Sequence, residues 1–243
     1  SASTVATTVS MSGDAIVTYT GGAKADNLTI SSTANFVHAI AGAGGTDTLN
    51  LTAAAALIDL GDVAVENLNI TVVAGADVTI ADAQGMHADV NVLTLTGGNS
   101  LSTFNTGTGT VTGVTSVDAS GFAGNVIAGF AAGVFDSTVT VTANTLLTDS
   151  VEAVYTADPA ATVTMNTNGV EIIKLTTTDV SGTWDLSGAV GATNITVDDV
   201  TAANGTADTI TLEKITAAHT IDILALQDDG IVIGTLADAT GDA

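Results

Sequence analysis

Apolar and polar residues alternate along most of this chain. In segments 77–80, 92–96, 138–142, 162–166 and 209–212, every second residue is apolar and the residues between are mostly Thr, Asn or Asp. A period of two predicts β-strands that bury one face, and β-branched threonine favours the strand conformation. Glycine-rich turns such as 42–45 and 97–98 separate the segments. The sequence therefore predicts an all-β chain, with one short helix expected over the alanine-rich segment 52–58.

A degenerate phrase, Val-x-x-apolar-x-apolar, recurs along the chain. It begins at Val65, Val90, Val114, Val151 and Val170, so the start positions of successive copies differ by 25, 24, 37 and 19 (90−65, 114−90, 151−114, 170−151). Such spacing predicts a parallel β-solenoid (β-helix) with coils of about 19–25 residues. The gap of 37 holds one long coil or two short ones, and Val65, Leu68 and Ile70 are expected to point inward.

A β-sandwich stays open as the alternative, because strands separated by regular turns are also typical of sandwiches. Either fold is expected to form a single elongated β domain over residues 1–243, or one that divides near 122–150. That region holds three of the five phenylalanines, Phe122, Phe130 and Phe135, among small residues. They fill the core or form a contact between subunits.

The charge of the chain is strongly one-sided. It has three lysines, no arginine and 26 acidic residues, which give a net charge of −23, although only 12% of the residues are charged. Unpaired carboxylates repel one another unless salt screens them or a cation binds them. Since the chain offers oxygen ligands and no cysteine, Ca²⁺ is the expected cofactor. The same charge excludes nucleic acid as a partner, and no apolar run is long enough for membrane insertion as a helix.

Candidate calcium ligands follow from one turn motif and its weaker copies. The segment Gly-Ala-Gly-Gly-Thr-Asp-Thr-Leu at 42–49 approximates the glycine-rich nonapeptide of calcium-binding β-rolls. Segments 21–28 and 204–210 are poorer copies, and two pairs of adjacent aspartates are further candidates. These are also read as plain turns and solvated loop charges. The candidate metal ligands are Asp26, Asp47, Asp208, Asp198, Asp199, Asp228 and Asp229.

Three phrases of this sequence resemble those of a known group of proteins. They are Gly-Gly-Thr-Asp-Thr-Leu-Asn-Leu at 44–51, Val-Glu-Asn-Leu-Asn-Ile-Thr at 65–71 and Val-Thr-Ser-Val-Asp-Ala-Ser-Gly at 114–121. The chain is similar, over about residues 20–215, to the C-terminal regions of Gram-negative bacterial surface-layer and related type I-secreted (RTX-like) calcium-dependent β-repeat proteins. The resemblance implies an extracellular, β-helical, Ca²⁺-dependent protein that assembles with itself. The chain lacks the tandem nonapeptide block of that family.

Catalytic motifs are missing from the sequence. His38, His87 and His219 lie far apart, and the pair His87 and Asp89 is read as incidental. The chain has no Gly-x-Ser-x-Gly elbow, no His-Glu-x-x-His and no phosphate-binding loop. We therefore expect no enzyme activity.

The expected function is that of a structural, self-assembling extracellular protein at the cell surface: a subunit of a surface-layer lattice, sheath or filament, stabilised by calcium. Its partners would be copies of itself and cell-surface polysaccharide. The alternative is a cell-surface adhesin or phage-type fibre that binds a ligand. Exposed aromatic residues would favour that alternative, and Trp184, Tyr19 and Tyr155 are the only Trp and Tyr residues.

Overall fold

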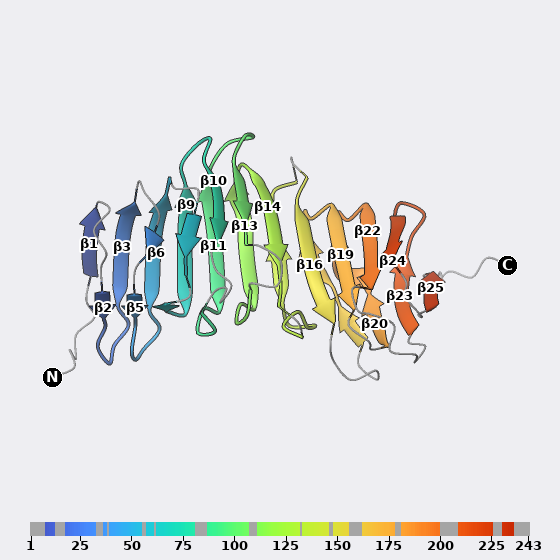
Figure 1. The fold of residues 1–243 in the computed structure, drawn as a ribbon, viewed down its shortest axis with the longest axis horizontal. Coiled ribbons are helices and arrows are strands. Elements are labelled where there is room, and N and C mark those ends of the chain that lie inside the picture. The colour runs from blue at the N-terminus through green and yellow to red at the C-terminus, as the bar shows by residue number, and fades with distance from the viewer. Residues whose placement is uncertain are drawn as a thin grey trace.

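The computed structural model shows a stack of β-strands with one short 3-10 turn, η1 (Leu186–Gly188) (Figure 1). It describes residues 8–12, 18–32, 36–37, 39–54, 57–60, 62–80, 87–106, 111–131, 133–145, 148–155, 162–177, 181–199, 209–225 and 230–235. All strand pairings among these residues are parallel. The predicted parallel β-solenoid is confirmed, and the β-sandwich alternative is wrong.

Two nine-stranded sheets run along the molecule. In spatial order the first sheet contains β1 (Thr8–Ser12), β3 (Asn27–Ser32), β6 (Thr48–Ala53), β9 (Asn67–Val72), β11 (Val92–Gly97), β13 (Ser116–Phe122), β15 (Thr140–Thr142), β18 (Asn166–Asn168) and β21 (Ala189–Val190). The second sheet contains β4 (Phe36–Val37), β7 (Leu57–Asp59), β10 (Asp77–Ile80), β12 (Thr103–Asn105), β14 (Asn125–Gly129), β16 (Ser150–Tyr155), β19 (Ile172–Thr177), β22 (Asn194–Asp199) and β24 (Thr220–Ala225).

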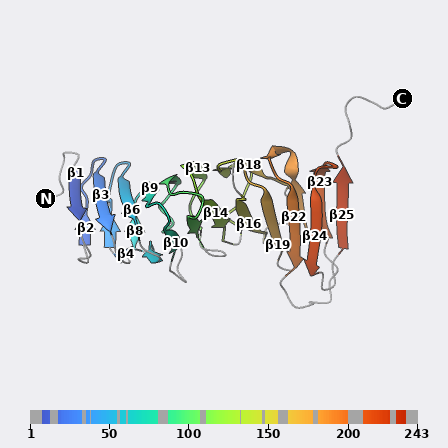
Figure 2. The same cartoon turned by 90° about the horizontal axis from the view of Figure 1, so that it is seen from above.

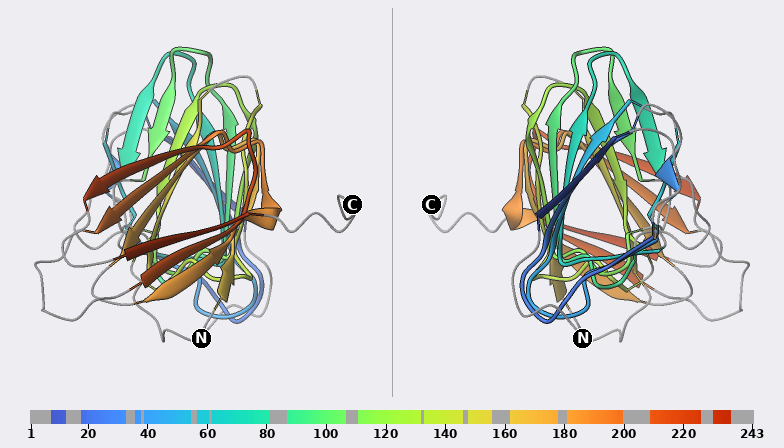
Figure 3. Two further views of the ribbon diagram at one scale, coloured as in Figure 1. Left: turned by 90° about the vertical axis from the view of Figure 1, so that its right-hand side faces the viewer. Right: turned by 90° about the vertical axis from the view of Figure 1, so that its left-hand side faces the viewer.

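Two shorter sheets form a third wall, one toward each end. They contain β2 (Thr18–Thr20), β5 (Ala39–Ala41) and β8 (Val63–Ala64), and β17 (Thr162–Thr164), β20 (Gly182–Asp185), β23 (Thr209–Ile215) and β25 (Gly230–Thr235). Figure 2 shows the strands following one another along the long axis, and Figure 3 shows the walls around the interior in end-on view. The chain therefore visits the walls in turn and advances by one strand spacing per coil.

Residue pairing between neighbouring strands gives the length of each coil. Thr48 pairs with Asn67, a separation of 19, and Asp77 pairs with Thr103, a separation of 26. The longest separation is 28, between Gly182 and Ile210, and the remaining pairings fall between 19 and 27. The predicted range of 19–25 therefore covers most coils but not the longest ones. The two predicted spacings of 25 and 24 are coil lengths, because β9 pairs with β11 at a separation of 25 and β11 with β13 at 24.

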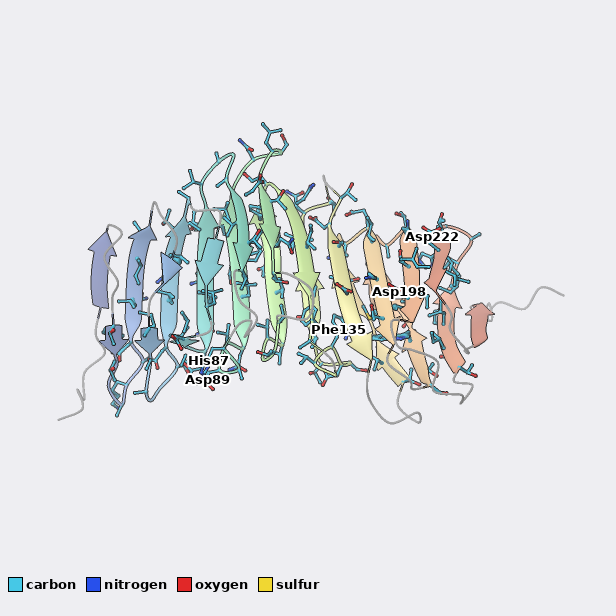
Figure 4. The ribbon with its side chains drawn as sticks, in the orientation of Figure 1. His87, Asp89, Phe135, Asp198 and Asp222 are labelled. Carbon is cyan, nitrogen blue, oxygen red and sulfur yellow. The ribbon has the colours of Figure 1, made fainter. Side chains whose placement is uncertain are left out.

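The core fills the interior with aliphatic side chains from every wall. Its buried residues form one cluster from Leu28 to Ile215, which continues through 122–150. Val65, Leu68 and Ile70 are buried as predicted. The three clustered phenylalanines, Phe122, Phe130 and Phe135, are buried as well, and the rings of the last two meet edge to face with centroids 5.0 Å apart. These phenylalanines therefore fill the core, and Phe135 lies toward one edge of the stack in Figure 4.

The outward side of the first sheet is nearly all threonine, asparagine and serine. Between β3 and β18 its outward residues alternate with the buried ones. We call this set the threonine–asparagine face: Asn27, Thr29, Ser31, Thr48, Asn50, Thr52, Asn67, Asn69, Thr71, Val92, Thr94, Thr96, Ser116, Asp118, Ser120, Thr140, Thr142, Asn166 and Asn168. The chain has five Asn-x-Ser/Thr sequences. Four of them begin on strands, at Asn27, Asn50, Asn69 and Asn194, and the fifth begins at Asn204, outside the described residues.

Three local expectations were wrong. No helix forms within the described part of 52–58, where β6 ends at Ala53 and β7 begins at Leu57. Segment 162–166 is not one strand, because β17 ends at Thr164 and β18 begins a new wall at Asn166.

The third error concerns the repeat. Copies at Val65, Val90 and Val114 precede strands of the first sheet, whereas those at Val151 and Val170 belong to strands of the second sheet. The gap of 37 therefore includes a change of wall. Val151 also pairs with Ile173 rather than with Val170, a separation of 22, so the predicted spacing of 19 is no coil length there.

Candidate functional site

The turn before β6 is shaped by a glycine and an aspartate five residues apart. A Cβ added to Gly42 would lie 2.0 Å from Asp47 Oδ2, and one added to Gly21 would lie 2.4 Å from Asp26 Oδ2. Gly42 therefore leaves the space that the Asp47 carboxylate occupies, and Gly21 leaves space for both the Asp26 carboxylate and the backbone carbonyl of Gly42 in the next coil. Asp26 and Asp47, the best candidate ligands from the sequence, are both buried polar residues at these turns.

Both aspartates accept backbone hydrogen bonds, and the acceptors follow one another from coil to coil. The Gly22 N–H donates to Asp26 Oδ2 at 2.8 Å, and the Asp26 N–H donates to Asp47 Oδ1 at 2.7 Å. The Asp47 N–H in turn donates to Glu66 Oε2 at 2.7 Å. We call Asp26, Asp47 and Glu66 the first corner ladder. Its carboxylates satisfy N–H groups at the corner just before the first sheet, where an unpaired buried donor would be costly.

The carboxylate of Asp47 lies close enough to those of Asp26 and Glu66 to be repelled by both. Burial raises the pKa of Asp47 above its ordinary value, and the hydrogen bond from the Asp26 N–H lowers it. The negative charges of Glu66 and Asp26 raise the pKa of Asp47 further. A positive charge bound at this corner would reverse the last effect.

A second arrangement of the same kind lies at the corner before the second sheet. The Val126 N–H donates to Asp149 Oδ1 at 2.6 Å, and the Asp149 N–H donates to Glu171 Oε2 at 2.8 Å. We call Asp149 and Glu171 the second corner ladder. The Glu171 carbonyl oxygen accepts from the N–H groups of Thr193 and Asn194 at 2.9 and 3.0 Å, just as the Glu66 carbonyl accepts from two N–H groups of its next coil.

Sequence reasoning missed the second corner ladder, although a signal for it exists. The first ladder reads Asp-Thr-Leu at 47–49 and Val-Glu-Asn-Leu at 65–68. The second reads Asp-Ser-Val at 149–151 and Val-Glu-Ile-Ile at 170–173. In both, an aspartate that opens a strand is followed one coil later by Val-Glu before the paired strand. Glycine-rich turns drew attention to the first ladder, and no such turn marks the second.

The surroundings of Asp149 disfavour its charged form more strongly than those of Asp47 do. Burial raises its pKa from 3.8 to about 6, while the hydrogen bond from Val126 lowers the pKa and the charge of Glu171 raises it. Asp149 is 1% exposed, and its Oδ2 is buried with no hydrogen-bond partner among the described residues. The same holds for Oδ1 of Asn125, which precedes Val126. This corner therefore has two buried acceptor oxygens that lack a donor.

The other candidate ligands are not brought together with Asp26 and Asp47. Asp198 lies on the second sheet, where its carboxylate is 3.5 Å from Lys174 Nζ, which also contacts Glu152 at 3.0 Å (Figure 4). The hydrogen bond to Glu152 raises the pKa of Lys174, although burial opposes it. Asp199 ends β22, but its side chain lies outside the described part of the chain, as do the whole of Asp208, Asp228 and Asp229.

No group of three or more His, Asp or Glu side chains in the described segments is placed to hold a metal ion. His87 Nδ1 lies 3.5 Å from Asp89 Oδ2, and the two side chains sit together at one edge of the stack (Figure 4). His87 borders an open depression of about 780 Å³ over β2, β5 and β8, whose lining is chiefly threonine and alanine.

Comparison with known protein families, with curated proteins and with solved structures finds no match to this chain. In the described segments, no helix is long and apolar enough to cross a membrane.

Proposed function

We propose that this chain is a structural module: a subunit of an extracellular, self-assembling polymer such as a surface-layer lattice, sheath or filament. One observation carries the proposal. The carboxylates of the two corner ladders accept backbone N–H bonds between successive coils. Their chemistry holds the stack together, as expected of a protein whose task is to be a rigid, regular rod.

The aromatic residues favour this function over the ligand-binding alternative. Trp184 is fully buried, and Tyr19 is partly buried and packs against the core. Neither forms the exposed aromatic platform on which sugar rings commonly stack, and the side chain of Tyr155 lies outside the described part of the chain. An adhesin or fibre that recognises a carbohydrate would therefore need another kind of site, and cell-surface polysaccharide is a second partner in this proposal only as an anchor.

Calcium is part of the proposal because of the kind of ligand atom that the corner ladders offer. They offer carboxylate oxygens, which Ca²⁺ prefers, and neither nitrogen nor sulfur ligands. Repulsion among Asp26, Asp47 and Glu66, together with the unbonded Asp149 Oδ2, is the condition that a bound cation would relieve. When bound, the ion would supply positive charge, while the carboxylates keep their bonds to the backbone.

The test compares assembly and melting with millimolar Ca²⁺ and with excess chelator at low salt. We expect polymers in negative-stain electron microscopy and light scattering with Ca²⁺. We also expect chelation to lower Tm by several degrees, since one saturated site adds about 2.7 kcal/mol at 100 times Kd. Asp47→Asn should lose part of the gain from Ca²⁺, and the exposed Asp77→Asn should keep it.

Two outcomes would contradict the two halves of the proposal separately. A sharp monomer peak at high protein concentration and millimolar Ca²⁺ would overturn self-assembly. Assembly with identical melting in chelator would overturn the role of calcium and leave the polymer standing.

A further inference from the structure

The threonine–asparagine face differs from the rest of the molecule in charge. Asp118 is the only charged residue among its outward positions, whereas the whole chain carries 26 acidic residues. The Asp118 carboxylate also accepts from the N–H and the hydroxyl of Ser120, at 3.1 and 2.6 Å. The outward side of the second sheet instead presents Asp77, Glu152, Lys174, Asp198 and Asp222.

The polar side chains of this face already bond to one another along the stack. Asn50 Nδ2 donates to Asn27 Oδ1 at 2.7 Å, and Asn69 Nδ2 donates to Asn50 Oδ1 at 2.9 Å. The hydroxyls of Thr71 and Thr96 lie 3.1 Å apart. Because these groups have partners within the chain, covering them removes less hydrogen bonding with water than covering free polar groups would.

We propose that the threonine–asparagine face is the surface through which two copies of this chain meet, face to face. This inference rests on the proposed self-assembly and names its interface. On a chain of net charge −23, approach through the second sheet would oppose several carboxylates, whereas approach through this face opposes two surfaces that each present a single carboxylate, Asp118, and share the same strand spacing. An interface between identical faces is two-fold symmetric, so β11, the central strand, meets β11 of the other copy.

The area of the face suits a weak contact that repeats in a polymer. The seven strands of the face, β3 to β18, are spaced about 4.8 Å apart and are about 18 Å long or, in β15 and β18, shorter. They cover no more than roughly 600 Å², below the ~800 Å² per partner of a standard interface. The sheet twists along the stack (Figure 3), so two copies touch closely only around their central strands. We therefore expect the contact to form at high protein concentration and to be reinforced by the other contacts of the polymer.

Thr94 on β11 and Thr196 on β22 form a matched pair for the test. Both are half-buried, outward threonines in the middle of a strand, one on each long sheet. Because the chain has no cysteine, Thr94→Cys and Thr196→Cys each introduce a single thiol. Under assembling conditions we expect Thr94→Cys to form disulfide-linked dimers at least tenfold faster than Thr196→Cys. We also expect Thr94→Glu to raise the protein concentration needed for assembly at least tenfold, whereas Thr196→Glu should leave that concentration unchanged. Circular dichroism and Tm confirm that each variant folds.

The outcomes separate this interface from the proposed function. If the unmodified chain never assembles, the proposed function fails and this contact with it. If the chain assembles but the Thr196 variants crosslink or weaken assembly as much as the Thr94 variants, self-assembly stands and the face-to-face contact is overturned. Polymers that grow only by pairing of strand edges would give that second result, because edge pairing leaves Thr94 exposed.

Discussion

In the first corner ladder Asp47 donates its N–H to Glu66 Oε2 at 2.7 Å, and in the second Asp149 donates its N–H to Glu171 Oε2 at 2.8 Å. This bond is the same in both ladders, but the residue whose N–H donates to the aspartate carboxylate differs. The carboxylate of Asp47 accepts from the polar Asp26, whereas that of Asp149 accepts from the apolar Val126 and leaves Oδ2 buried and unbonded. Only for Asp149 does burial raise the pKa as far as about 6.

The difference separates two requirements that a corner residue meets. An acid one coil ahead is needed because the N–H at the corner requires an acceptor that the backbone of the next coil does not supply. The free-energy cost of burying that acid in its charged form depends on the neighbouring coils, which lie far away in sequence. In the first ladder, therefore, the negative charge of Asp47 costs comparatively little free energy. In the second ladder the fold favours the neutral form of Asp149.

Filling the space beside Asp47 should break the first ladder most severely. In Gly42→Ala the new Cβ would lie within 2.0 Å of Asp47 Oδ2, so the carboxylate must move and the Asp26 N–H loses its acceptor. We expect a loss of about 2–3 kcal/mol in the free energy of unfolding, measured by denaturant titration.

Gly44→Ala, in the same turn, is the matched control. Its Cβ would find its nearest neighbour at 3.4 Å, so we expect a change below about 0.5 kcal/mol. In the double variant Gly42→Ala/Asp47→Ala the clash should shrink to the one contact that remains, 2.8 Å between the two Cβ atoms, so the two losses should add to less than their sum. Additive losses would mean that the strain lies in the backbone of the turn rather than against the carboxylate.

Removing the glutamate acceptors tests whether the two ladders are equivalent. Glu66→Ala and Glu171→Ala should each destabilise the fold by about 1–2 kcal/mol, because each leaves an aspartate N–H at a corner without its acceptor. Glu→Gln at either position keeps an oxygen acceptor and should lose less. Equal stability of the Ala and Gln variants would show that these bonds contribute nothing, and a large effect at only one position would show that the ladders are not equivalent.

The sequence predicts the repeating parts of this fold well. The alternation at 77–80 marks β10, and the spacings of 25 and 24 are coil lengths, because a solenoid stacks like residues on like. The same logic failed at Val151, where the phrase lies three residues out of register with Val170. A short apolar phrase fits a strand of any wall, so it does not say which wall a copy belongs to.

The corner ladders were predictable only in part. The glycine-rich turn pointed to Asp26 and Asp47, although what it reveals is room for a carboxylate and a backbone bond. Glu66 and the whole second ladder were missed, because their bonds join residues 19 to 23 positions apart (66−47, 149−126). Such bonds appear only after the coils are stacked. The pKa of Asp149 likewise depends on burial by coils that its own segment does not contain.

The smallest effect expected is a change in the pH dependence of stability. The folded-state pKa of Asp149, about 6, lies above its ordinary value of 3.8, so the folded protein binds more protons than the unfolded chain between these values. The stability that Asp149 contributes is thus fully present below about pH 4 and is lost as the pH rises through 6.

Asp149→Asn keeps an oxygen for the Val126 N–H and removes the titrating group. We expect Tm to fall between pH 4.5 and 7.5 by a few degrees less in this variant than in the unmodified chain, measured at constant ionic strength. Asp47→Asn should flatten the profile less. The general repulsion of a −23 chain contributes nearly equally in all three proteins, so a variant at position 149 that keeps the full slope would show that Asp149 is ionised in the fold at no cost.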